Sequence, residues 1–140
     1  MLIVDPTTLD KAGLYDLACG LDPAASDHAA AKQRCIEFVL AETLGHWHNR
    51  ARAMMCRRLK HCALTPAESR QLADAITARL AAGKIPEQFR DQLRLALHLD
   101  PQRTLEAAHS CLASRKEYIR RFATWAILHR TNPENPSYNS

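Results

Sequence analysis

Glycine is scarce in this sequence, with four residues among 140. A phosphate-binding loop needs several glycines close together, and the sequence contains neither such a loop nor a Gly-x-Ser-x-Gly motif. Aromatic residues are also few, at 6%, which leaves little ring surface for stacking on nucleic-acid bases. These shortages exclude the common nucleotide-binding loops and the nucleophile motif of the α/β-hydrolases.

Long apolar runs and paired cysteines are missing as well. No apolar segment approaches the length that crosses a bilayer, and residues 1–6 are too short for the core of a secretion signal. The five cysteines are scattered and include no Cys-x-x-Cys pair, which indicates reduced residues in a core rather than a disulfide framework. We therefore expect a cytoplasmic location.

Proline, by contrast, is placed in a regular way. Proline fits the first position of a helix, where its fixed φ is already helical and its missing N–H would have no partner. Five of the seven prolines stand in pairs that mark predicted helix starts: Asp5-Pro6, Asp22-Pro23, Thr65-Pro66, Ile85-Pro86 and Asp100-Pro101. Gly20, Gly45 and Gly83 fall where apolar helical patterns end, and they predict left-handed helix caps.

These signals predict an all-α fold of about seven short antiparallel helices. Their apolar spacing places them at about 7–19, 24–44, 46–62, 66–82, 86–99, 101–112 and 115–130. Thr65 and Glu68 have the spacing of a capping box, and no segment alternates with the period of a strand. We expect residues 1–130 to form a single helical domain and residues 131–140 to be a disordered tail.

The segment Ser114–Leu128 carries a family resemblance. Its branched Ile119 is followed by Arg120, and Ala123 and Ala126 are spaced for close helix packing. This order resembles the first helix of a HEAT-type repeat, and weaker forms of it extend the resemblance over residues 46–130. The resemblance implies a HEAT-like α–α superhelix or a compact helical bundle that serves as a scaffold, usually for protein and sometimes for nucleic acid.

Basic residues gather in two of the predicted helices. Residues 46–62 contain five basic residues and no acid, and residues 115–130 contain five basic residues and one acid. Such clustering indicates a polyanionic partner, or else acidic helices near the N-terminus that neutralise the basic ones. Arg50 and Arg57 on the first helix, with Lys116, Arg120 and Arg121 on the second, are the candidate contacts to an anionic partner.

The residues that could carry chemistry do not have the spacing that chemistry requires. Two metal ligands on one helix must lie three or four residues apart, and no His/Cys pair does so, hence we expect neither a metal nor a cofactor. Glu87 and Asp91 are the one tight carboxylate pair, and we interpret them as charges that favour the positive end of a helix. An enzyme would need a site assembled from several helices.

The leading functional hypothesis is a non-enzymatic module that docks on another protein. Arginine and aromatic residues supply most of the binding energy in such interfaces. The candidate contacts are therefore Arg50, Arg57, Arg120 and Arg121, with Trp47, Tyr118 and Trp125 where these prove exposed. Two alternatives stay open: a nucleic-acid-binding protein that uses helices 46–62 and 115–130, and an enzyme. The sequence does not predict the oligomeric state.

Overall fold

The computed structural model describes residues 5–43 and 45–130, and in these ranges the chain forms seven α-helices and one short 3-10 helix. The elements are η1 (Pro6–Thr8), α1 (Lys11–Cys19), α2 (His28–Leu40), α3 (His46–Leu59), α4 (Pro66–Ala82), α5 (Phe89–Leu99), α6 (Pro101–Cys111) and α7 (Glu117–Leu128). None of the described residues is in a strand, so the prediction of an all-α fold is confirmed. The predicted tail, 131–140, lies outside the described residues.

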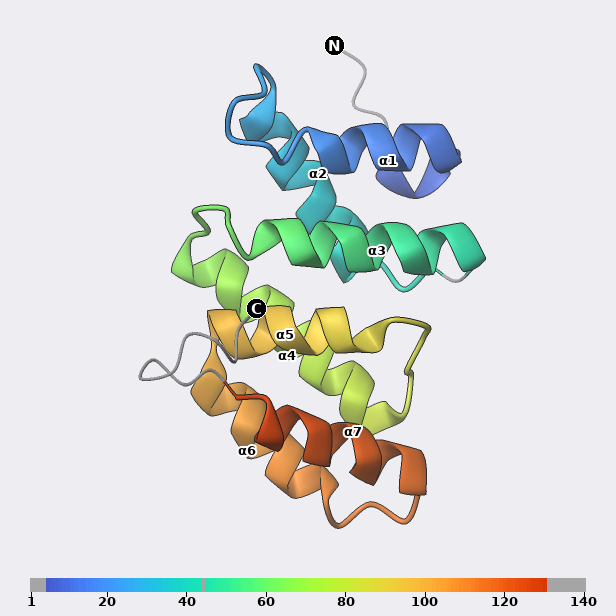
Figure 1. Cartoon of the computed structure of the whole chain (residues 1–140), viewed down its shortest axis with the longest axis vertical. Helices are drawn as coiled ribbons and strands as arrows, with labels where there is room; N and C mark the ends of the chain where they lie inside the picture. The colour runs from blue at the N-terminus through green and yellow to red at the C-terminus, as the bar shows by residue number, and fades with distance from the viewer. Residues whose placement is uncertain (1–4, 44, 131–140) are drawn as a thin grey trace.

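The helices are stacked in two layers. Figure 1 shows α1, α3, α5 and α7 one after another in the nearer layer, with α2, α4 and α6 behind them. Contacts among the described residues follow this order: each helix packs on the next helix of its own layer, and neighbours in the chain also pack on each other, apart from α3 and α4. Each layer thus exposes one long face to solvent, and the apolar sides of both layers meet between them. The antiparallel orientation of neighbouring helices stays a prediction.

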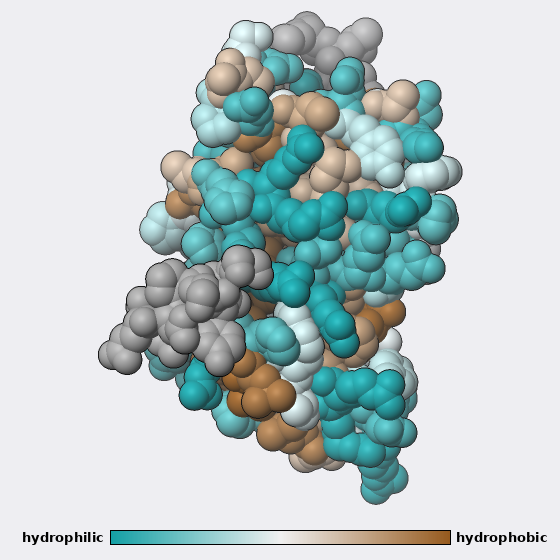
Figure 2. All heavy atoms as spheres, viewed as in Figure 1, coloured by the Kyte–Doolittle hydropathy of each residue, from teal (hydrophilic) through white to brown (hydrophobic). Residues whose placement is uncertain are grey.

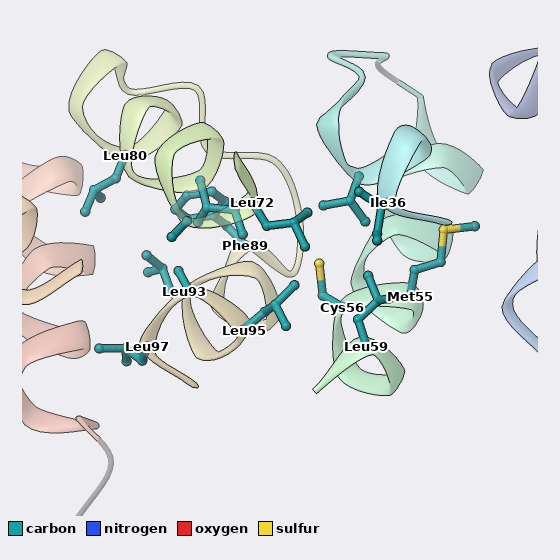
Figure 3. Close-up of a cluster of buried hydrophobic side chains, with 14 of the residues drawn as sticks. Ile36, Met55, Cys56, Leu59, Leu72, Leu80, Phe89, Leu93, Leu95 and Leu97 are labelled. Atoms are coloured by element: carbon teal, nitrogen blue, oxygen red, sulfur yellow. The ribbon is translucent and has the colours of Figure 1, made fainter. Parts of the chain in front are cut away.

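The core is one cluster of buried side chains that receives residues from all seven helices. Figure 3 shows its middle, where Leu72 of α4 and Leu95 of α5 point toward Ile36 of α2 and Cys56 of α3. These side chains are 3% exposed or less. Because leucine and alanine dominate the cluster, the core is held by apolar burial along the whole stack.

Two helix starts are as predicted because their signals are entirely local. At α4 the Thr65 hydroxyl accepts from the Glu68 N–H over 3.1 Å, and the Glu68 carboxylate accepts from the Thr65 N–H over 2.9 Å. At α6 the Asp100 carboxylate accepts from the Arg103 N–H over 3.1 Å, with Pro101 in the first position. The capping box and the Asp-Pro start are therefore confirmed.

The other three Pro-based starts are wrong in detail. The helix predicted at 7–19 is divided, because Asp5 caps the short η1 and Asp10 caps α1 separately. Pro23 lies in a chain of turns, where Asp22 accepts the Ala24 N–H, and α2 begins later, at His28. Pro86 also precedes its helix, since the next turn places Gln88 at φ 63, a left-handed conformation that no α-helix continues through.

The predicted ends shift for related reasons. The second helix ends at Leu40 rather than at 44, the third at Leu59 rather than at 62, and the seventh covers 117–128. Gly83 has the predicted left-handed conformation at the end of α4, with φ 74. Gly20 does not, with φ −65; its lack of a Cβ instead allows α2 to pack closely, since a Cβ there would lie 2.6 Å from that of Ala31. Gly45 begins α3 rather than ending α2.

Candidate functional site

Asp91 of α5 forms two ion pairs, one of which joins α5 to α3. Its carboxylate accepts from Arg57 of α3 over 2.8 Å and lies 3.4 Å from an Nη of Arg94. Asp91 is nearly buried, whereas about half of each arginine side chain is exposed. The acid that neutralises Arg57 therefore comes from α5, and the interpretation that the N-terminal helices neutralise this arginine is wrong. Glu87, its predicted companion, precedes α5 and lies 3.6 Å from His46.

Trp125 of α7 lies beside two arginines of α5 and the ring of His129. The guanidinium carbons of Arg90 and Arg94, both on α5, lie 5.5 and 5.2 Å from the centre of its ring. His129 stacks on the indole, with ring centres 4.4 Å apart and planes 16° from parallel. The two arginines are exposed and Trp125 is half-buried, so this group forms a cationic surface between α5 and α7.

Trp47 of α3 has a similar environment at the other end of the layer. The Lys11 ammonium of α1 lies 3.7 Å from the centre of its ring, and the Arg50 guanidinium lies 5.7 Å from it. Tyr15 meets the indole edge-on, with ring centres 6.5 Å apart. Trp47 is 39% exposed, so it meets the condition of exposure under which it was named as a candidate contact.

The predicted contacts on α7 are arranged less uniformly. Arg120 is half-buried, and its guanidinium donates to the Ser114 carbonyl over 2.6 Å, which fixes the loop before α7. Arg121 is exposed and pairs with Glu117 over 3.0 Å. Lys116 is exposed at the start of the helix, and its ammonium lies 5.9 Å from the Tyr118 ring. Arg120 thus has a structural partner, and the exposed Tyr118 has a weak one, since its hydroxyl donates to the Gly83 carbonyl over 3.5 Å.

The structure places α5 between α3 and α7, as Figure 1 shows, so the two predicted basic helices do not pack on each other. The intervening helix supplies Arg90 and Arg94, which the sequence analysis did not select. Figure 2 shows hydrophilic side chains across the middle of this face. We refer to Arg57, Arg90, Arg94 and Trp125 as the arginine–tryptophan surface.

His98 lies near the end of α5. Burial, together with the charges of Lys60 and His61 after α3, lowers the pKa of His98.

A second group of basic side chains is buried instead of exposed. Arg52 of α3 is 2% exposed and Arg79 of α4 is 6% exposed. Both reach the end of α2, where the Ala41 carbonyl accepts from Arg52 over 3.1 Å and from Arg79 over 3.4 Å. Arg79 also donates to Val39 over 2.6 Å and to Gln92 over 2.8 Å. The two guanidinium groups therefore satisfy carbonyls that a helix end leaves unpaired.

These two arginines line a pocket of about 360 Å³. The pocket lies where the end of α2, the first half of α3, the end of α4 and the start of α5 meet. Its buried polar residues are Arg52, Arg79 and Gln92, and Glu42 and Lys84 form an exposed ion pair of 3.2 Å at its edge. The pocket is thus more positive in its interior than at its mouth.

Burial disfavours the charged forms of both arginines. Loss of water contact, together with the nearby charge of Arg79, lowers the pKa of Arg52 to about 10. Burial likewise lowers the pKa of Arg79, against the opposing influence of Glu42. Both groups are still cationic at neutral pH, which gives the pocket two positive charges close together.

The sequence contains a signal for these two buried arginines, although neither was among the predicted site residues. Arg52 follows the buried Ala51 and lies three positions before the buried Met55, on the apolar side of its helix. Arg79 lies three positions after the buried Ile76, in the apolar stripe of α4. A basic residue at a core position of a helix is unusual and indicates a buried charge with a specific partner.

The described residues offer little that resembles a catalytic centre. Glu42 and Lys84 are within hydrogen-bond reach of each other at the pocket, but the side chains of both are more than 60% exposed. General acid–base groups act best where water is excluded. No group of three or more His, Cys, Asp and Glu among these residues could hold a metal ion. Within the same ranges, no helix has both the length and the apolar character to cross a membrane.

Comparisons with known proteins give no match: no family model, no curated protein and no solved structure is similar to this chain. The resemblance to HEAT-type repeats therefore stays a prediction that rests on the residues of 46–130. The function is therefore inferred from the geometry of the arginine–tryptophan surface and of the buried Arg52 and Arg79.

Proposed function

We propose that this protein is an interaction module without chemistry of its own, which binds an acidic surface of another protein through the arginine–tryptophan surface. The observation that supports this proposal most directly is the fixed arrangement of Arg90 and Arg94 beside Trp125. Arginines that are held in place lose less side-chain entropy on binding, and arginine and tryptophan are the residues that dominate interface energies.

Charge favours an acidic partner. The helix α3 carries four arginines and no acid, and α5 and α7 each carry two arginines and one acid. On this face, Asp91 already neutralises part of the charge of Arg57 and Arg94, whereas no acid among the described residues pairs with Arg90. A carboxylate of a partner would therefore find its best position near Arg90.

Nucleic acid is a weaker candidate for the same surface. Base stacking requires an aromatic ring with a free face. His129 stacks on Trp125, and the Lys11 ammonium lies over Trp47. The three exposed arginines of α3 would still neutralise phosphates, so nucleic acid is the alternative that the experiment has to separate from protein.

Two further parts of the proposal are a HEAT-like repeat architecture and a cytoplasmic location. The two-layer stacking of the helices supports a repeat scaffold, since repeats of this kind contact mainly their neighbours. All five cysteines are free thiols, which suits a reducing compartment.

The test is a pull-down from cell lysate with nuclease present, followed by binding measurements with each purified partner. Arg90→Glu reverses a charge on the proposed surface, and Arg70→Glu makes the same change at an exposed position of α4 in the other layer. We expect Arg90→Glu to weaken binding about tenfold or more and Arg70→Glu to leave it within about twofold.

Three results would contradict the proposal. The first is recovery of nucleic acid alone, with an affinity that falls steeply as salt is raised. The second is a protein partner whose affinity is unaffected by Arg90→Glu. The third is an equal loss with both variants, because net charge rather than this surface would then control binding.

A further inference from the structure

Arg52 and Arg79 are charged and buried. Their guanidinium groups are close enough to share the Ala41 carbonyl as an acceptor. None of the ion pairs among the described residues includes either arginine. Buried charges are normally paired with an opposite charge, because carbonyl groups offset the loss of water only in part. The described residues therefore provide these two charges with hydrogen bonds but with no ion-paired carboxylate.

The two guanidinium groups also have donors to spare. Each guanidinium has five N–H donors. In both residues the Nη2 atom is directed to backbone carbonyls around the end of α2. The Nη1 of Arg52 has only a long contact of 3.4 Å to Asn49, and its buried Nε has no acceptor among the described residues. Hydrogen-bonding capacity thus remains on a side chain that lines the pocket.

The rest of the pocket suits an apolar group. Ala41, Ile85 and Pro86 line it beside the arginines, and all three are partly exposed. Its volume of about 360 Å³ lies near the lower end of the range for pockets that bind small molecules. A ligand that fits would have an apolar body of a few carbon atoms and one anionic end.

We propose that this pocket binds a small carboxylate with a short apolar body, held at its anionic end by Arg52 and Arg79. A carboxylate is planar and accepts parallel hydrogen bonds from guanidinium donors. The apolar residues would cover the carbon chain and exclude water from it. Because the pocket does not include the arginine–tryptophan surface, the proposal does not depend on the protein–protein interaction proposed above.

The experiment is an NMR titration of the ¹⁵N-labelled full chain with three probes: hexanoate, hexanamide and inorganic phosphate. Hexanamide has the same carbon chain without the charge, and phosphate has the charge without the chain. We expect hexanoate to give saturable shifts at the side-chain amides of Asn49 and Gln92, and the other two probes to give none. Equal shifts with hexanamide, or shifts with phosphate but not with hexanoate, would overturn the proposal.

Variants at the edge of the pocket provide the control for specificity. Glu42 and Lys84 are exposed and pair only with each other, so neither substitution should affect folding. Glu42→Gln removes a repelling charge and should tighten hexanoate binding about two- to fivefold, and Lys84→Gln should weaken it by a similar factor. If neither variant changes the affinity, hexanoate binds elsewhere and the proposal is wrong.

Discussion

Arg57 of α3 and Asp91 of α5 form a 2.8 Å ion pair across 34 residues of sequence. The carboxylate lies in the first turn of its helix, where the helix dipole favours negative charge, and Arg94 contacts its second oxygen. One nearly buried acid thus connects two neighbouring helices of the same layer and holds two arginines of the proposed binding surface in position.

Removing that acid should destabilise the stack. Asp91→Asn leaves Arg57 and Arg94 without their anion and should lower the free energy of unfolding by about 1–2 kcal/mol, since hydrogen bonds to charged groups contribute at that level. Urea unfolding measures the change. Glu117→Gln breaks the fully exposed pair with Arg121 and is the control, with an expected loss below about 0.5 kcal/mol. Equal losses would contradict a special role for Asp91.

The buried arginine of α4 should matter far more than an exposed one on the same helix. Arg79→Met leaves the carbonyls of Val39 and Leu40 and the amide of Gln92 without their donor, which should cost about 3 kcal/mol or more. Arg79→Lys restores one charged donor and should cost less. Arg70→Met is the control and should stay within about 0.5 kcal/mol. Chemical denaturation compares the three, and a loss below about 1 kcal/mol for Arg79→Met would contradict the prediction.

The end of α4 requires glycine for two separable reasons. Gly83 has φ 74, and a Cβ there would lie 2.5 Å from the Tyr118 hydroxyl. The left-handed conformation alone should make Gly83→Ala cost about 1–2 kcal/mol. Tyr118→Phe removes the hydroxyl, so Gly83→Ala should cost less in that background than in the unaltered protein. Thermal unfolding of the four proteins measures the coupling, and equal losses in both backgrounds would show that the hydroxyl does not clash.

Stability should fall in alkaline solution because of buried thiols. Burial raises the pKa of Cys35 and of Cys56 to about 12, from the ordinary thiol value of 9.0. The unfolded chain therefore releases the two thiol protons at a lower pH than the folded chain does. The free energy of unfolding that the buried thiols contribute below pH 9 is lost as the pH rises toward 12. By pH 10 each thiol should account for a loss of about 1 kcal/mol relative to pH 8.

Cys35→Ala isolates this effect, because it removes one titrating thiol from the core. The decline between pH 8 and pH 10 should be about 1 kcal/mol smaller in this variant than in the unaltered chain. Denaturant unfolding at the two pH values provides the comparison. Arg52 has the opposite effect, because its lowered pKa of about 10 favours the folded chain at higher pH. Both proteins contain Arg52, so its effect drops out when their pH profiles are subtracted. Parallel pH profiles would contradict the prediction.

The sequence was a reliable guide wherever a signal acts within one turn of a helix. Thr65 with Glu68, and Asp100 with Pro101, both determine a helix start through neighbouring atoms, and both starts are observed. An Asp-Pro or Ile-Pro pair is also compatible with a turn, and this is why Pro23 and Pro86 did not begin helices. At these two prolines the surrounding residues, rather than the Asp-Pro or Ile-Pro pair itself, determined whether a helix began.

The composition and the spacing of apolar residues determined that this protein is all-helical, because burial of one face of each helix follows directly from that spacing. Only the tertiary structure decided which cations are exposed and which are buried. Arg52 and Arg57 belong to the same helix, but one reaches the end of α2 and the other reaches Asp91. Contacts of this kind join residues far apart in the chain, and no local pattern encodes them.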